Sequence, residues 1–132
     1  MISKVMIVDD DPDTLESIKS ILEYHHYEAI IARSGRECLK KIEEGFKGII
    51  LIDILMPEMN GWDTIREIID KGFIKNVAIN ILTGLVTKDQ QMMGIYEPYV
   101  YDYLTKPVEV NQLMSSVKKC NTYLSARENI EK

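Results

Sequence analysis

Short apolar runs alternate along the chain with segments in which apolar residues recur every three or four positions. Continuous apolar runs of this length are typical of strands buried on both faces, as in a parallel sheet. The runs predict strands at residues 4–9, 28–32, 49–53, 77–82 and 100–104. Because a helical segment follows each strand, the pattern predicts one α/β domain with a doubly wound, five-stranded parallel sheet and five helices.

Capping residues mark where the first two helices begin. Asp11 is a suitable N-cap, with Pro12 at the first helical position. Ser34 and Glu37 have the spacing of a capping box, and Gly45 is a suitable stop for the second helix. Both helices therefore have a defined start directly after a predicted strand.

The other three helices are located by turn residues and proline. The third follows a loop with Pro57 and Gly61, and the fourth is short, opened by Thr87 and Gln90 and ended by Pro98. The fifth begins near residue 109, and fraying after residue 127 predicts a domain over residues 1–127 with a frayed tail at 128–132. The apolar residues expected on the inner faces of the five helices are Leu15, Ile18, Ile21, Leu22, Cys38, Leu39, Ile42, Trp62, Ile65, Ile68, Ile69, Met92, Met93, Tyr96, Leu113, Met114, Val117 and Leu124.

Composition narrows the class of protein. The chain has 132 residues, 45% of them hydrophobic and 28% charged, which fits one globular domain. A net charge of −5 argues against direct nucleic-acid binding, which uses a basic face. The apolar runs are far shorter than the roughly twenty residues that span a bilayer, and the N-terminus lacks a signal-peptide pattern. We therefore expect a cytoplasmic protein without membrane insertion.

Cysteine and histidine are not expected to carry chemistry. Cys38 and Cys120 lie far apart on predicted helices, as expected for free thiols in a reducing compartment. His25 and His26 fall near the end of the first helix, away from the carboxyl ends of the strands. A solvated helix end accounts for them better than a metal pair or a phosphohistidine.

Five polar residues follow the predicted strands at their carboxyl ends. Asp9 and Asp10 follow the first strand, Asp53 the third, Thr83 the fourth and Lys106 the fifth. In an open α/β sheet these ends meet at one edge, where ligands bind. Three neighbouring carboxylates repel one another, and a divalent cation together with a lysine removes that cost. Oxygen ligands of this kind suit Mg²⁺.

Each residue also has a simpler interpretation when it is taken alone. Asp9 and Asp10 could be loop residues, but Asp11 already satisfies the capping role. A lone Asp53 could cap a loop. A threonine at a strand end, such as Thr83, is by itself weak evidence for a functional site. Taken together they favour chemistry: a carboxylate can attack phosphorus to form an acyl phosphate, and a nearby ammonium such as that of Lys106 neutralises the transferring group.

Four strings of residues resemble the receiver domain of two-component response regulators, the CheY-like family. They are IVDDDP at residues 7–12, DILMPEMNG at 53–61, TG at 83–84 and YLTKP at 103–107. The resemblance covers nearly the whole chain and implies the flavodoxin-like (βα)5 receiver fold.

The family's site residues can be carried over position by position. By resemblance Asp53 is the phosphoacceptor, and Mg²⁺ is held by Asp9, Asp10 and Asp53 with the backbone carbonyl of Leu55. Lys106 is similar to the lysine that pairs with the phosphoryl group. The peptide bond that joins it to residue 107 is expected to be cis, as is usual in the family.

The resemblance also implies a switch. Thr83 and Tyr103 match the switch pair: Thr83 moves toward the phosphoryl group and Tyr103 turns inward into the space that it leaves. This would reshape the face formed by the fourth helix, fifth strand and fifth helix, through which a downstream protein partner would bind. A phosphoryl group adds roughly two negative charges, enough to bias such a surface.

The implied reaction is transfer of a phosphoryl group to Asp53 from the phosphohistidine of a histidine kinase or a phosphotransfer protein. The chain would then be a self-modifying signalling switch and not a turnover enzyme. No segment after the fifth helix is long enough for an output domain, which predicts a stand-alone receiver, unless the sequence is part of a longer protein. The kinase, the pathway and the oligomeric state, a homodimer included, stay open.

Two departures from the family pattern stand out. Tyr99 and Val100 replace the small Gly-Ala pair that usually precedes the fifth strand, and tyrosines at 96, 99, 101 and 103 crowd this region. They fill the core or form an aromatic contact surface. Leu55 and Leu85 are apolar where the family influences hydrolysis of the phosphoryl group, which predicts a long-lived phosphoaspartate.

Two other functions compete with this interpretation. A receiver-shaped docking module that is never phosphorylated would fit the fold, but all the acceptor residues are intact. A phosphatase of the haloacid dehalogenase type would need a second acid two residues after the nucleophile. Leu55 occupies that position, and the chain has no cap domain.

Overall fold

The computed structural model describes residues 4–84 and 95–131. Five parallel strands form one sheet in the order β2-β1-β3-β4-β5. The predicted doubly wound α/β fold is confirmed. The strands are β1 (Lys4–Val8), β2 (Glu28–Ala32), β3 (Gly48–Asp53), β4 (Val77–Thr83) and β5 (Val100–Thr105).

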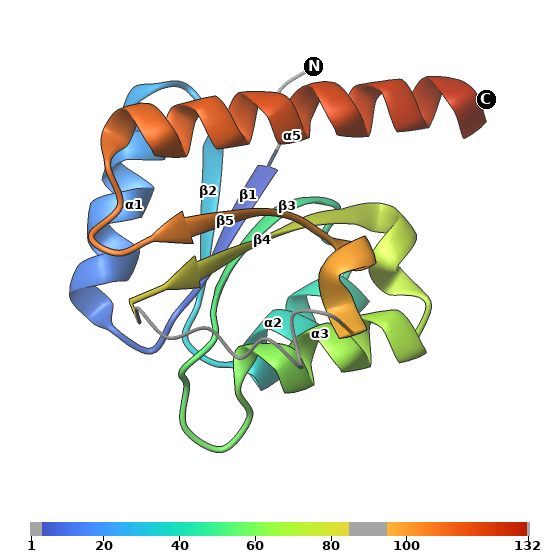
Figure 1. The fold of residues 1–132 in the computed structure, drawn as a ribbon, viewed down its shortest axis with the longest axis horizontal. Helices are drawn as coiled ribbons and strands as arrows, with labels where there is room; N and C mark the ends of the chain where they lie inside the picture. The colour runs from blue at the N-terminus through green and yellow to red at the C-terminus, as the bar shows by residue number, and fades with distance from the viewer. Residues whose placement is uncertain (1–3, 85–94, 132) are drawn as a thin grey trace.

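Helices cover both faces of the sheet (Figure 1). The described residues form four α-helices: α1 (Pro12–Tyr24), α2 (Gly35–Glu43), α3 (Gly61–Asp70) and α5 (Val110–Glu131). α1 and α5 lie on one face, and α2 and α3 on the other. Each face has its own apolar cluster against the sheet, and every residue of the central strand β3 is buried.

Most predicted helix starts agree with the structure. The side chain of Asp11 accepts a hydrogen bond from the backbone N–H of Asp13, and Pro12 opens α1. The Ser34 hydroxyl accepts from the backbone N–H of Glu37 at 3.1 Å, as an N-cap should.

Some boundaries differ from the prediction. α5 continues to Glu131, past Arg127, where we expected fraying. Two short 3-10 helices, η1 (Phe73–Asn76) and η2 (Glu97–Tyr99), were not predicted. Five residues invoked for the fourth helix and the site lie outside the described part of the chain: Leu85, Thr87, Gln90, Met92 and Met93.

The pairing of β4 with β5 contains a β-bulge. Ile79 pairs with Val100, but the next residue, Asn80, pairs with Asp102, so Tyr101 is an extra residue in β5. Regular pairing resumes from Asp102 to the end of β5. A bulge changes which side of the sheet each neighbouring side chain faces.

Candidate functional site

The carboxyl ends of four strands bring the predicted polar residues to one edge of the sheet. Asp9 directly follows β1, Asp53 is the last residue of β3, Thr83 is the last residue of β4, and Lys106 directly follows β5. Parallel strands place these positions together although they are up to 97 residues apart in sequence.

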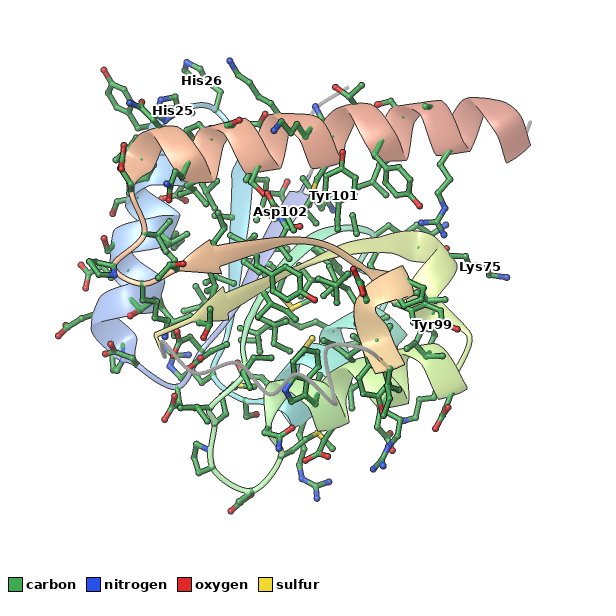
Figure 2. The ribbon with its side chains drawn as sticks, in the orientation of Figure 1. His25, His26, Lys75, Tyr99, Tyr101 and Asp102 are labelled. Atoms are coloured by element: carbon green, nitrogen blue, oxygen red, sulfur yellow. The ribbon has the colours of Figure 1, made fainter. Side chains whose placement is uncertain are left out.

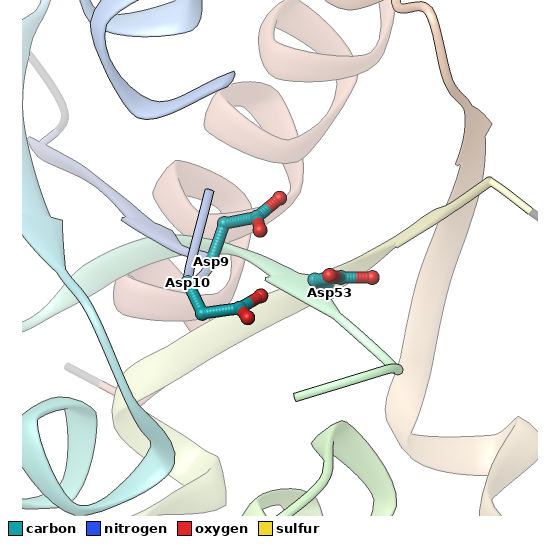
Figure 3. A group of neighbouring side chains, drawn as sticks. All are labelled: Asp9, Asp10 and Asp53. Atoms are coloured by element: carbon teal, nitrogen blue, oxygen red, sulfur yellow. The ribbon is translucent and has the colours of Figure 1, made fainter. Parts of the chain in front are cut away.

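Three carboxylates converge at this edge (Figure 3). Asp9, Asp10 and Asp53 each offer an oxygen, and these oxygens lie within 4.8 Å of one another. Asp9 is fully buried and Asp53 is 6% exposed, whereas Asp10 faces solvent. A set of hard oxygen donors with one open side suits Mg²⁺, which keeps several water ligands. The residues present therefore fit the predicted ion.

Lys106 joins two of these carboxylates. Its Nζ donates to Asp9 Oδ2 at 2.5 Å and lies 3.3 Å from Asp53 Oδ2. Burial lowers the pKa of Lys106, but the hydrogen bond to Asp9 and the charges of both carboxylates outweigh burial and raise it. The backbone N–H of Lys106 donates to the Thr83 carbonyl at 2.8 Å, and the Lys106–Pro107 peptide is cis, as expected.

Asp53 is an unusually weak acid for an aspartate. Burial, followed by the negative charge of Asp9, raises its pKa from 3.8 to about 6, while Lys106 acts in the opposite direction. The raised pKa means that ionising Asp53 costs free energy in the folded protein. A cation bound beside the carboxylate would lower that cost. A carboxylate of raised pKa among charged partners is typical of functional sites.

The loop after Asp53 is held by backbone contacts. The N–H of Leu55 donates to Asp53 Oδ1 at 3.3 Å, and the N–H of Gly61 donates to the Ile54 carbonyl at 2.9 Å. A Cβ at Gly61 would lie 2.5 Å from the Asp53 carbonyl oxygen, so only glycine permits this approach. The Leu55 carbonyl as an Mg²⁺ ligand stays a prediction.

A capping box fixes the other end of this loop. The side chain of Asn60 accepts from the N–H of Asp63 at 2.9 Å, and the Asp63 carboxylate accepts from the N–H of Asn60 at 3.3 Å. This capping box was not predicted, because the residue three positions after the N-cap is Asp63 and not the usual glutamate or glutamine.

Comparison with known proteins agrees with this geometry. The family model described as "Response regulator receiver domain" matches residues 5–118. The chain belongs to this family. It is therefore a receiver domain of two-component signalling.

Similar proteins share the whole receiver domain. A solved CheY-like receiver domain protein from Methanospirillum hungatei JF-1 is 39% identical with a TM-score of 0.80, over 96% of this chain and 97% of that chain. "Protein PilH" of Pseudomonas aeruginosa is 27% identical, over 87% of this chain and 94% of its own length.

Other relatives are longer than this receiver domain. The "Transcriptional regulatory protein CpxR homolog" of Haemophilus influenzae is 32% identical over 88% of this chain, which spans only 49% of that relative. The chain thus covers about half the length of this curated relative. Within the described residues, no helix has the length and apolar character needed to cross a membrane.

The two predicted switch residues of the receiver lie on adjacent strands. Thr83 is partly buried at the end of β4 and pairs with Thr105 of β5. Tyr103 packs against the cluster beneath α2 and α3, and its hydroxyl oxygen is buried. Burial, and then the charge of Glu97, raises the pKa of Tyr103. Tyr103 therefore already faces inward, while its role as a switch stays a prediction.

The remaining tyrosines divide between core and surface. Tyr96 is buried and stacks on Trp62 with ring centroids 5.8 Å apart. Tyr99 and Tyr101 keep 41% and 40% of their surface exposed. Tyr96 and Tyr103 therefore pack in the core, whereas the aromatic contact surface formed by Tyr99 and Tyr101 stays a prediction.

The histidines and cysteines lie away from the site. His25 Nδ1 lies 2.9 Å from the Ile21 carbonyl, and His25 and His26 are exposed at the end of α1 (Figure 2). Cys38 and Cys120 are free and buried, and burial raises the pKa of each thiol to about 12. Neither pair belongs to the acidic site, in agreement with the sequence pattern.

A second group of polar residues was missed in the sequence. Asn80 is fully buried in β4 and contacts Ser116, which in turn contacts Asp102. The available signal was an amide within the apolar run of residues 77–82. A buried amide needs a hydrogen-bond partner, and its partners are distant in sequence.

Proposed function

We propose that this receiver domain accepts a phosphoryl group on Asp53 from the phosphohistidine of a histidine kinase or phosphotransfer protein, in a reaction that depends on Mg²⁺. The observation that carries the proposal is the position of Asp53. Its carboxylate lies beside two further carboxylates and 3.3 Å from the ammonium of Lys106. A docking module would not require this arrangement, and a phosphatase of the haloacid dehalogenase type would need a second acid at the position of Leu55.

The transfer is a nucleophilic displacement at phosphorus. A carboxylate oxygen of Asp53 attacks the phosphorus, the bond from phosphorus to the imidazole nitrogen breaks, and that nitrogen retains the electron pair and takes up a proton. With a pKa of about 6, Asp53 is mostly ionised at neutral pH and can attack.

The surrounding residues supply charge. The Lys106 ammonium is placed to donate to an oxygen of the transferred group, which gains stabilisation in the transition state. Asp9 accepts a hydrogen bond from the same ammonium and so holds it in place. When bound at Asp9, Asp10 and Asp53, Mg²⁺ would neutralise further charge on the phosphoryl oxygens.

The acyl phosphate would act as a signal. In this proposal Thr83 moves toward the phosphoryl group, Tyr103 is held inward, and the face that includes β5 and α5 changes its affinity for a downstream protein. The neighbouring location of these residues on β4 and β5 supports this step. The chain modifies itself and passes on the change by binding.

Intact mass spectrometry tests the proposal. The chain is incubated with acetyl phosphate and Mg²⁺, beside Asp53→Asn and the exposed control Asp70→Asn. We expect one added phosphoryl group in the native chain and in Asp70→Asn. We expect none without Mg²⁺ and none in Asp53→Asn, because the nucleophile is lost.

Two results would contradict the proposal. A phosphoryl group that persists in Asp53→Asn would place the acceptor elsewhere. No added mass in the native chain, together with no adduct with beryllium fluoride, would favour a docking module. A beryllium fluoride adduct without added mass would instead indicate rapid loss of the phosphoryl group.

A further inference from the structure

A chain of hydrogen bonds crosses the interior between β4, β5 and α5. The Cys120 thiol donates to Asn80 Oδ1 at 3.3 Å, and Asn80 Nδ2 donates to the Ser116 hydroxyl oxygen at 2.9 Å. The Ser116 hydroxyl donates to Asp102 Oδ2 at 2.8 Å, and Asp102 Oδ1 accepts from the backbone N–H of Tyr103 at 2.8 Å. The three side-chain bonds run in one direction and end on the Asp102 carboxylate.

The residues in this series of hydrogen bonds are mostly buried, so few other hydrogen-bond partners are within their reach. Asn80 and Cys120 are fully buried, and Ser116 is 2% exposed. Burial raises the pKa of the Cys120 thiol to about 12, so it remains protonated and donates at neutral pH. An unpaired buried amide or hydroxyl costs free energy, so the arrangement in which all are paired is strongly preferred.

This series of hydrogen bonds reaches β5 at the bulge. Asn80 pairs with Asp102, and Tyr101 is the extra residue before it. Figure 2 shows Tyr101 and Asp102, although consecutive, both between β5 and α5. The Tyr101 hydroxyl donates to the Lys119 carbonyl at 3.3 Å, so both side chains engage α5.

The register at Asp102 fixes the pairing of the rest of β5. From this point Tyr103 pairs with Ile81 and Thr105 with Thr83, and the N–H of Lys106 then donates to the Thr83 carbonyl. A slip of one residue would turn each side chain to the other face of the sheet. Tyr103 would leave the core, and Lys106 would no longer reach Asp9 and Asp53.

We propose that Asn80, Ser116 and Asp102 form a register lock, a set of positioning residues that fix β5 against β4 and thereby place Lys106 at the acidic site. Because β4 is buried on both faces of the sheet, an alternation of apolar and polar residues does not select its register, whereas the directional hydrogen bond from Asn80 does. The lock ties the register to α5, since Ser116 lies on that helix.

A kinetic experiment tests the lock, and it rests on the proposed phosphorylation of Asp53. The rate of phosphorylation by acetyl phosphate is measured for Ser116→Ala and Asp102→Asn, and Mg²⁺ affinity is measured in the same samples. We expect the rate to fall about tenfold, as for a displaced catalytic group. Mg²⁺ affinity should rise, because displacement of Lys106 leaves the carboxylates of Asp9 and Asp53 without their neighbouring cation.

Val117→Ala is the matched control. Val117 is the neighbour of Ser116 on α5 and is fully buried, but it packs in the apolar cluster outside the lock. We expect a loss of Tm similar to that of Ser116→Ala with a native phosphorylation rate. An equal fall in rate in Val117→Ala, or no fall in Ser116→Ala, would overturn the lock.

An NMR measurement separates failure of the lock from failure of the proposed function, because it needs no phosphodonor. In Asp102→Asn, which keeps the size of the side chain, we expect the largest amide shift changes beyond residue 102 at Tyr103, Lys106 and Thr83. Asp9 and Asp53, which contact Lys106, should change as well, whereas residues of β2 at the opposite edge of the sheet should change little. Uniform small changes would overturn the lock, whether or not the native chain becomes phosphorylated.

Discussion

At the scale of single residues, the acidic site is a set of charges that balance only in part. Lys106 is one cation between two buried carboxylates, and a third carboxylate lies on the open side. The pKa of Asp53 is raised by its burial and by repulsion from the carboxylate of Asp9. The predictions at this scale change one charge or one polar group at a time.

Asp53→Asn should stabilise the metal-free chain at pH 7. The folded pKa of about 6 exceeds the ordinary 3.8, so the folded state binds more protons between these values, and its free energy of unfolding falls as pH rises. We expect the free energy of unfolding to rise by about 1–2 kcal/mol at pH 7. The gain is smaller than the pKa shift alone implies, because Lys106 loses a partner in the variant. Below about pH 4 the variant and native chain should converge. Urea unfolding in EDTA across this pH range measures the free energy of unfolding of both proteins. The same pH dependence in the variant and in the native chain would contradict the raised pKa of Asp53.

Lys106→Met should destabilise the metal-free chain by about 2–4 kcal/mol, because it leaves the fully buried Asp9 without its cation. Mg²⁺ would then restore more stability to the variant than to the native chain. The rise in Tm on adding Mg²⁺ is the measurement. Lys71→Met, at an exposed ion pair with Glu43, is the control. Equal rises in Tm would show that Lys106 and Mg²⁺ do not share these carboxylates.

Leu55→Asn should shorten the lifetime of the phosphoaspartate several-fold. Leu55 is 56% exposed beside Asp53 and cannot orient water, whereas an amide can hydrogen-bond to it. Loss of the phosphoryl group after removal of acetyl phosphate is followed by intact mass. Leu55→Ala separates the effect of added space from that of the amide. An unchanged or slower loss in Leu55→Asn would contradict the prediction.

At the scale of elements, the loop from β3 to α3 depends on one close backbone approach and one capping box. Gly61 begins α3 directly against the Asp53 carbonyl, and the capping box pairs the backbone N–H groups of Asn60 and Asp63. The position of Asp53 therefore depends on how α3 begins as well as on β3.

Gly61→Ala should lower both stability and phosphorylation. A Cβ there would lie 2.5 Å from the Asp53 carbonyl oxygen and 2.9 Å from the Ile54 Cα, and we expect a cost of about 2–3 kcal/mol from overpacking. Gly72→Ala is the control, since it has a φ of 78° but nothing within 4 Å. It should cost about 1 kcal/mol and leave phosphorylation unchanged. Equal phosphorylation in both variants would show that Gly61 serves folding alone.

At the scale of the whole molecule, the acidic site and the exposed tyrosines lie on different parts of the surface. The site is at the carboxyl edge of the sheet, whereas Tyr99 and Tyr101 lie near the start of β5. Tyr101 also contacts Tyr123 of α5, with ring centroids 5.2 Å apart. We predict that these exposed tyrosines form a contact for a partner, because tyrosine is enriched in interface hot spots.

The double variant Tyr99→Ala, Tyr101→Ala should weaken self-association or partner binding by tenfold or more, at about 1 kcal/mol or more per tyrosine. Sedimentation with beryllium fluoride, and binding to a cognate kinase, are the measurements. Tyr24→Ala, which removes an 80% exposed tyrosine at the end of α1, is the control. Unchanged binding in the double variant would exclude this surface.

The sequence by itself determined the class of fold and which polar residues lie at the carboxyl edge of the sheet. Apolar runs specify buried strands, and a polar residue directly after each run must lie at the carboxyl edge of a parallel sheet. Asp9, Asp53, Thr83 and Lys106 could therefore be named from local pattern alone. The helix starts at Asp11 and Ser34 were equally local, because a cap bonds within its own first turn.

Only the tertiary structure decided the contacts that join distant segments. The pKa of Asp53 depends on burial and on Asp9, and the bulge at Tyr101 depends on Asn80 of another strand. The link through Ser116 requires α5 to pack across β4 and β5. No local pattern encodes these, because burial, register and charge coupling arise only when separate elements meet.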